Sequence, residues 1–253
     1  MLGYLKDEIT NILRNFFRII KRLLPIFLPI PYLYKLNLKI LILPKHHWTQ
    51  YFQGTYEPET FKKIKEIFKN KQIKSFWDIG ANVGMFSVFI AKNYSCSINS
   101  FEPSKKYYRI LKLNTSFFKN IKIHNFGLGS SDKKEKIILT KEPGSNYISR
   151  NKFDKYKKNS EICELKTIKN ISKIDFPNLA KIDVEGFEYE ILNSSIDFFK
   201  KNKTILIIEI DLGNLKRYKK NKKDIIKILK SRNYLVERIS NSNNYYCYLK
   251  NNF

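Results

Sequence analysis

Apolar positions change their spacing repeatedly along the chain beyond Trp48. Short runs rich in β-branched and aromatic residues alternate with longer stretches in which apolar residues recur every three to four positions. The short runs are typical of buried strands, and the longer stretches are typical of helices packed on a sheet. The alternation predicts an α/β fold with a mostly parallel sheet covered by helices on both faces. Strands are expected at 75–80, 97–103, 121–128, 179–184 and 204–210, and helices at 83–93, 104–119, up to about 200 and up to about 232.

The last part of the pattern departs from this alternation. Runs 234–239 and 245–249 are expected to close the sheet as a pair, with an antiparallel last strand. Between residue 133 and about residue 170 the rhythm breaks, and β-like runs flank a polar loop that contains glycine. We interpret this stretch as an insertion, and such surface segments often carry substrate contacts.

The first residues show a different pattern. Apolar side chains from Leu5 to Leu23 follow helical spacing, and basic residues occupy the other faces. The uncharged run 23–34 contains three prolines and is shorter than the ~20 residues that span a bilayer. Asp7 and Glu8 lie where a secretory signal would be basic, so we do not expect export.

The sequence therefore predicts a helical extension at residues 1–50 and a catalytic domain at residues 51–253. Two interpretations of the extension remain open. Residues 1–45 could bind a membrane surface peripherally, or the helix could pack on the domain or on a second copy in a homodimer. We expect a cytoplasmic location, at the inner face of the membrane if the helix binds lipid.

Composition changes this picture little. The net charge of +25 suggests nucleic acid or an anionic membrane as a partner. Lys and Asn are, however, spread over nearly every segment, and no nucleic-acid docking motif is present, so we do not expect a nucleic-acid partner. The three cysteines are far apart and the three histidines do not cluster with them, which fits a reducing compartment and predicts no zinc site.

Candidate chemistry begins where the first strand ends, at Asp78-Ile-Gly80-Ala-Asn82-Val-Gly84. Glycines at a strand-to-helix turn let the backbone approach a ligand closely. The spacing is G-x-x-x-G rather than the G-x-G-x-x-G of dinucleotide sites, and no Walker lysine follows. Glu102 ends the second strand roughly 20 residues later, where a carboxylate can accept both hydroxyls of a ribose. S-adenosylmethionine fits this set, because it lacks phosphates and presents an ammonium that Asp78 can meet.

These motifs resemble those of the FkbM methyltransferases. The resemblance covers about residues 75–210 and includes 78–87, Phe101-Glu-Pro103, Asn125-Phe-Gly-Leu-Gly129 with Asp132, and 181–188. It implies a class I, Rossmann-like methyltransferase fold and S-adenosylmethionine as cofactor. The residues that would hold the cofactor are Asp78, Gly80, Asn82, Gly84, Glu102, Pro103, Gly127 and Asp132. Family members usually carry a Leu-Asp pair where this chain has 166–171, which is a departure.

The catalytic residues are expected after the fourth strand. Ligands of open α/β sheets bind outside the carboxyl ends of the strands, and strand alternation places Lys181, Asp183 and Glu185 on one side. Our hypothesis is that Asp183 or Glu185 is the general base and that Lys181 orients the carboxylates. The alternative is an ordinary ion pair between Lys181 and Glu185, and we expect Glu188 only to cap a helix. A magnesium ion could assist, but the assured ligands are too few to predict one.

The expected function is O-methylation of a hydroxyl on a sugar, a glycan or a related metabolite, as the resemblance implies. The alternative enzyme is a methyltransferase that uses the basic surface to bind RNA or another nucleic acid. The sequence lacks the [DN]-P-P-[YF] motif and the Pro-Cys nucleophile of such enzymes. A non-enzymatic scaffold with a decayed site is a third interpretation, against which the intact Asp78, Gly80, Gly84 and Glu102 argue.

Overall fold

The computed structural model describes residues 27–34, 37–44, 56–140, 145–150, 154, 157–171 and 174–250, the first two segments by their backbone alone. The chain divides into two compact units, residues 1–56 and 57–253. In the first unit, β1 (Phe27–Tyr34) and β2 (Asn37–Pro44) pair antiparallel. Residues 27–34 and 37–44 are therefore strands and not part of the expected helical extension, and the prolines in them disfavour a helix because proline lacks the backbone donor. The predicted helix between Leu5 and Leu23 lies outside the described residues.

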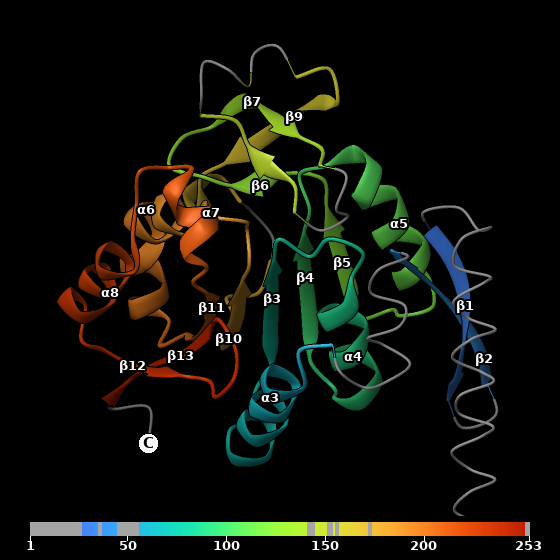
Figure 1. Cartoon of the computed structure of the whole chain (residues 1–253). Coiled ribbons are helices and arrows are strands. Elements are labelled where there is room, and N and C mark those ends of the chain that lie inside the picture. Colours follow the sequence, from blue (N-terminus) through green and yellow to red (C-terminus); the bar gives the residue numbers. More distant parts are fainter. Residues whose placement is uncertain are drawn as a thin grey trace, which may run out of the picture. The chain divides into compact units, whose positions relative to one another are not determined.

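The second unit is built on one seven-stranded sheet (Figure 1) with the order β12-β13-β11-β10-β3-β4-β5. The five strands from β11 to β5 are parallel, and β13 runs antiparallel to both of its neighbours. This confirms the predicted α/β sheet with an antiparallel closing pair. The strands are β3 (Ser75–Ile79), β4 (Ser97–Phe101), β5 (Ile121–His124), β10 (Leu179–Ile182), β11 (Ile205–Glu209), β12 (Tyr234–Arg238) and β13 (Asn244–Leu249).

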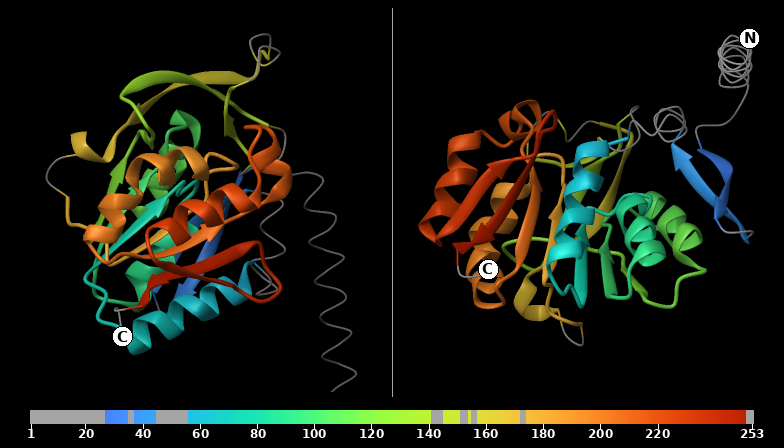
Figure 2. Two further views of the ribbon diagram at one scale, coloured as in Figure 1. Left: turned by 90° about the vertical axis from the view of Figure 1, so that its left-hand side faces the viewer. Right: turned by 90° about the horizontal axis from the view of Figure 1, so that it is seen from below.

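Helices pack on both halves of this sheet (Figure 2). Helices α4 and α5 contact each other and lie by β4 and β5, whereas α6 and α8 contact each other and lie by β11 and β12. The helices are α3 (Pro58–Asn70), α4 (Met85–Asn93), α5 (Lys105–Thr115), α6 (Glu188–Lys201), α7 (Leu212–Lys216) and α8 (Lys222–Ser231). None of the helices in the described segments combines the length and apolar composition that crossing a bilayer requires.

The helices of the structure differ from the predicted ones in two places. The single helix expected up to about residue 232 is two helices, because Asn221 begins α8 with a capping box that includes Asp224. Helix α3 was not predicted, although Pro58 in its first turn and the buried Ile64 and Ile67 at helical spacing are ordinary signals.

The core lies around the central strands. All residues of β3 and β10 are buried, as expected for parallel strands covered on both faces. Trp77, Phe101 and Ile182 belong to one cluster that continues into α6 and β11. Burial on both faces fixes the positions of these strands, and their carboxyl ends meet at one edge of the sheet.

The predicted insertion supplies three strands of a second, four-stranded sheet with the order β6-β9-β7-β8, and β6 precedes the insertion. This second sheet is drawn above the carboxyl ends of the main strands in Figure 1. The expected strand 121–128 is interrupted after His124, and its last two residues pair with the insertion instead. The strands are β6 (Gly127–Leu128), β7 (Lys133–Ile138), β8 (Tyr147–Ile148) and β9 (Ser160–Lys166), and the short helix η2 (Ile168–Asn170) follows.

Candidate active site

The glycine turn after β3 has a geometry that other residues cannot adopt without strain. Gly80 has φ +86, and a Cβ placed on it would lie 1.9 Å from the backbone oxygen of Asp183. Gly84, with φ +89, precedes α4 and faces Leu111. Asn82 lies between them with φ 51, and its Oδ1 is buried without a hydrogen-bond partner among the described residues. The turn therefore passes directly against the end of β10 and presents an unused acceptor.

Asp78 is 2% exposed and serves as an anchor for the helix that follows. One of its oxygens accepts hydrogen bonds from the backbone N–H of Ser87, at 3.1 Å, and from the Ser87 hydroxyl. Burial raises the pKa of Asp78 to about 6, whereas the hydrogen bonds from Ser87 and the charge of Lys181 oppose this rise. Asp78 thus fixes the start of α4 against β3 and holds the glycine turn between them.

Glu102 joins the two predicted cofactor motifs. Its two oxygens accept hydrogen bonds from the backbone N–H groups of Asn82 and Ser104, both at 2.8 Å. Burial raises its pKa to about 7, although both hydrogen bonds lower it. Pro103 lies beside Gly127, where an added Cβ would come within 3.4 Å of the proline ring. These residues share the sheet edge with the glycine turn.

Asp132 has a different environment from the other predicted cofactor residues. It accepts hydrogen bonds from Thr167, at 2.7 Å from the backbone N–H and 3.0 Å from the hydroxyl, and from the side-chain amide of Asn170. These hydrogen bonds lower its pKa. Through these hydrogen bonds Asp132 stabilises η2. None of the hydrogen bonds described for Asp132 connects this residue to the glycine turn.

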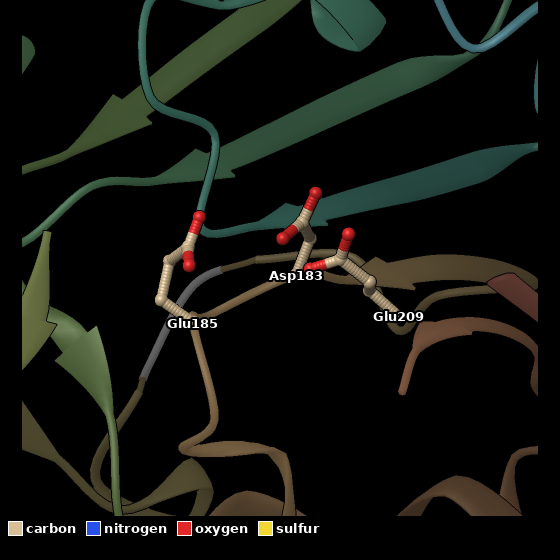
Figure 3. Close-up of side chains that lie close together, drawn as sticks. All are labelled: Asp183, Glu185 and Glu209. Atoms are coloured by element: carbon tan, nitrogen blue, oxygen red, sulfur yellow. The ribbon is translucent and has the colours of Figure 1, made fainter. Parts of the chain in front are cut away.

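Three carboxylates converge at the ends of β10 and β11 (Figure 3). Oxygen atoms of Asp183, Glu185 and Glu209 lie within 4.8 Å of one another. The predicted strand alternation does not produce this, because β10 ends at Ile182 and Glu185 has φ 57. The parallel register pairs Ile182 with Ile208, so the next residues along both strands are Asp183 and Glu209.

Lys181 is the cation of this cluster and is 1% exposed. Its ammonium donates to Asp183 and lies 4.3 Å from the ring centroid of Phe86. The alternative pairing of Lys181 with Glu185 is not observed. Three carboxylates suit a divalent cation, but Lys181 already supplies positive charge to one of them, and the sequence prediction of no metal remains untested.

Burial and neighbouring negative charges raise the pKa values of two carboxylates in this cluster. Burial raises the pKa of Glu185 to about 8, with further contributions from Asp183 and Glu188. The charge of Asp183 is the largest cause that raises the pKa of Glu209 to about 10, followed by burial. Asn214 donates to Glu185 at 2.7 Å. Glu188 accepts hydrogen bonds from the backbone N–H groups of residues 184 and 186, which lie in the turn before α6, so it supports this turn rather than capping the helix as expected.

Sequence reasoning missed two acidic residues here. Glu209 is an acid at the end of an otherwise apolar strand, a signal that could have identified it. Glu57 precedes α3, accepts a hydrogen bond from Asn244 at 3.0 Å, and has a pKa that burial raises and Lys181 lowers. No local pattern connects Glu57 with residue 181, so only the folded chain reveals this proximity.

An open cleft of ≈ 590 Å³ adjoins the carboxylates. This volume lies within the roughly 300–1,000 Å³ typical of small-molecule sites. The cleft combines residues of the insertion with residues that follow β10 and β11, and its lining consists of Thr140, Ser145, Glu185, Glu209, Asp211, Asn214 and Arg217. The glycine turn contacts Asp183, and the carboxylate of Asp183 lies within 4.8 Å of Glu185 and Glu209 in the cleft lining, so the carboxylate cluster connects the turn with the cleft.

Comparison of the sequence with known protein families identifies one match. The model of the methyltransferase FkbM domain matches residues 78–236. No curated protein matches the sequence. The crystal structure of methyltransferase FkbM from Methylobacillus flagellatus is 20% identical, with a TM-score of 0.44, over 69% of this chain and 43% of that chain. This chain thus spans less than half the length of that protein.

Two further solved structures are also similar to this chain. Precorrin-6y C5,15-methyltransferase from Geobacter metallireducens has 15% identity and a TM-score of 0.38, over 69% of this chain and 76% of that chain. Ribosomal protein L11 methylase from Lactobacillus delbrueckii subsp. bulgaricus has 10% identity and a TM-score of 0.42, over 70% and 69%. The model of the FkbM domain covers well over half of the residues of this chain, and the chain therefore belongs to the FkbM family of S-adenosylmethionine-dependent methyltransferases.

Proposed function

We propose that this chain transfers a methyl group from S-adenosylmethionine to a hydroxyl of a sugar, a glycan or a related metabolite. The observation that carries this proposal is the contact between the glycine turn and the carboxylate cluster. Gly80 packs against the backbone oxygen of Asp183, and Glu185 lines the neighbouring cleft. The donor and the acceptor could therefore meet where a base is available.

The residues at the glycine turn fit the cofactor. Asn82 offers a buried acceptor without a described partner. Each carboxylate oxygen of Glu102 accepts one backbone hydrogen bond and has further lone pairs for ribose hydroxyls. Gly80 and Gly84 allow the tight turn that brings the backbone N–H of Asn82 to Glu102. The cofactor, when bound, supplies the reactive methyl group on a sulfonium, and the chain must align the acceptor and remove its proton.

Glu185 is the group that we assign to proton removal. It lines the cleft, Asn214 orients it, and a pKa of about 8 lies near the operating range in which a general base is most effective. The acceptor oxygen bonds to the methyl carbon as the carbon–sulfur bond breaks, and the hydroxyl proton passes to Glu185. Asp183 forms an ion pair with Lys181 and contacts Gly80 through its backbone oxygen, so Lys181 balances one negative charge of the cluster beside the glycine turn.

The test measures cofactor binding and turnover separately. Glu185→Gln and Asp183→Asn should retain binding of S-adenosylmethionine in calorimetry. Glu185→Gln should lower turnover by roughly 10²- to 10⁴-fold, the usual contribution of a general base. Fractionated extract of the source cell supplies the acceptor, and label transferred from S-adenosylmethionine shows which fraction contains it. Normal turnover in Glu185→Gln would refute the assignment of Glu185 as the base, and label in RNA would favour the nucleic-acid alternative.

A further inference from the structure

A second pocket, of ≈ 160 Å³, adjoins the cleft and has the opposite charge. Arg217 lines both cavities, so they share a wall. Polar and aromatic residues of the insertion and of the segment after α7 form its lining, notably Tyr147, Arg150, Asp154, Lys157, Arg217 and Tyr218. Three cationic side chains thus face one carboxylate, whereas the cleft next to it is lined by three carboxylates and only one cation.

The cations of this pocket differ in what they already bind. Arg150 pairs with Glu135 at 2.9 Å, and Lys157 pairs with Asp154 at 3.0 Å. The hydrogen bond described for Arg217 runs from one guanidinium nitrogen to the backbone oxygen of Glu185 at a long 3.4 Å. A guanidinium has five N–H donors in a planar fork that matches carboxylate and phosphate groups. Arg217 therefore keeps donors for a ligand at the junction of the two cavities.

The pocket is held in shape before any ligand arrives. The guanidinium of Arg217 lies 4.6 Å from the ring centroid of Tyr147, an arrangement that restricts its rotamers. The Tyr218 hydroxyl donates to the backbone oxygen of Ile148 at 2.8 Å and so joins the insertion to the segment after α7. Tyr218 also packs edge-on against the buried ring of Phe187 at 5.6 Å. Such preorganisation lowers the entropy cost of binding.

We propose that the acceptor carries an oxyanion, a phosphate or a carboxylate, and that Arg217 binds this group in the small pocket while the sugar occupies the cleft. The inference rests on the proposed function and adds the charge class of the acceptor. A volume of ≈ 160 Å³ is below the roughly 300 Å³ lower limit of small-molecule sites, so it suits one substituent rather than a whole ligand. The three cations of the pocket attract an anion, whereas the acid-lined cleft offers it only Arg217, and this difference would fix the orientation of the acceptor.

The experiment measures binding of defined probes to the full chain by calorimetry or ligand-observed NMR. Uridine diphosphate represents a phosphate-bearing sugar, glucuronate an acidic sugar, and glucose a neutral one. We expect at least one anion to bind more tightly than glucose, and the stronger of the two identifies the source of the oxyanion. Arg217→Ala should weaken that binding by about 10- to 100-fold, the usual effect of losing a charged hydrogen bond. Arg217→Lys should weaken it less, because charge remains without the fork.

Arg109→Ala is the matched control, since Arg109 is exposed on α5 and its loss lowers the net charge equally. Equal weakening by Arg109→Ala and Arg217→Ala would overturn the proposal, because the +25 charge alone would then explain anion binding. The proposal would also be overturned if neither anion bound more tightly than glucose. Titration of S-adenosylmethionine into the same samples is the separate readout of the proposed function, so the two failures are distinguishable.

Discussion

Replacing Gly80 with alanine tests whether contact between the glycine turn and β10 holds the site together. The new Cβ would lie 1.9 Å from the backbone oxygen of Asp183, and backbone atoms cannot rotate away as a side chain could. A non-glycine residue at φ +86 costs about 1–2 kcal/mol, and overpacking adds about 1–3 kcal/mol. Separation of the strands would also break the hydrogen bond from Asp183 N to Ile79 O, worth about 1 kcal/mol.

These costs together predict that Gly80→Ala lowers the free energy of unfolding by about 3–6 kcal/mol, a large part of the roughly 5–15 kcal/mol that stabilises a typical domain. At roughly 2–4 °C per kcal/mol, the melting temperature should fall by about 6–24 °C. Urea denaturation measures the free energy, and calorimetry with S-adenosylmethionine should show weaker binding in the variant.

Gly213→Ala is the matched control for Gly80→Ala. Gly213 lies in α7, and its added Cβ would lie 3.1 Å from the side-chain oxygen of Asp211 that caps this helix, a contact that needs a shift of only a few tenths of an ångström. We expect a change within about 1 kcal/mol, since alanine also favours the helix by about that amount. A Gly80→Ala variant as stable as the control would refute the claim that this turn requires glycine.

Three further predictions concern titratable groups. With Glu185 as base, kcat/KM should rise with pH to a half-maximum near pH 8, and Glu185→Gln should abolish that rise; a profile flat from pH 6 to 9 would contradict the assignment. The folded pKa of Asp78, about 6, exceeds the ordinary 3.8, so the folded chain binds more protons and stability falls as pH rises through this window. Between pH 4 and 7, the free energy of unfolding measured by urea denaturation should therefore fall by about 3 kcal/mol less in Asp78→Asn than in the unchanged chain. Asp132→Ala should loosen η2 and increase proteolysis there, yet weaken S-adenosylmethionine binding far less than Glu102→Ala in calorimetry.

The parts of the site that could be predicted are those encoded by short motifs on consecutive elements. Asp78 lies next to the last residue of β3, Gly80 and Glu102 directly follow two adjacent strands, and parallel strands bring their carboxyl ends together. Their local interactions were less predictable. Asp78 bonds the first turn of α4, because a buried carboxylate needs donors and the backbone N–H groups at a helix start lack partners.

The carboxylate cluster shows why the rest could not be predicted. Glu209 meets Asp183 through the register of β10 and β11, a long-range pairing that no local spacing encodes. Glu185 reaches the same place because the chain leaves the strand after Ile182 and adopts a positive φ, which strand periodicity does not anticipate. Lys181 selects Asp183 as its partner for the same reason. Motif reading identified three members of this cluster, but their pairing depends on where the strand ends.

The cluster is costly for stability, and this cost connects the two proposals. Burying Glu185 and Glu209 beside Asp183 raises the pKa of both, so folding opposes their ionisation. Lys181 offsets only one negative charge. A base poised near neutral pH needs such an environment, but an anionic acceptor would disfavour the ionisation of Glu185 further unless a cation held the anion away from the cluster. Arg217 lowers the pKa of Glu185 and also lines the basic pocket, so one side chain can tune the base and draw the anion past the carboxylates. Loss of Arg217 should therefore raise both the acceptor KM and the pH of half-maximal kcat/KM, whereas a residue that only stabilised the fold would change neither selectively.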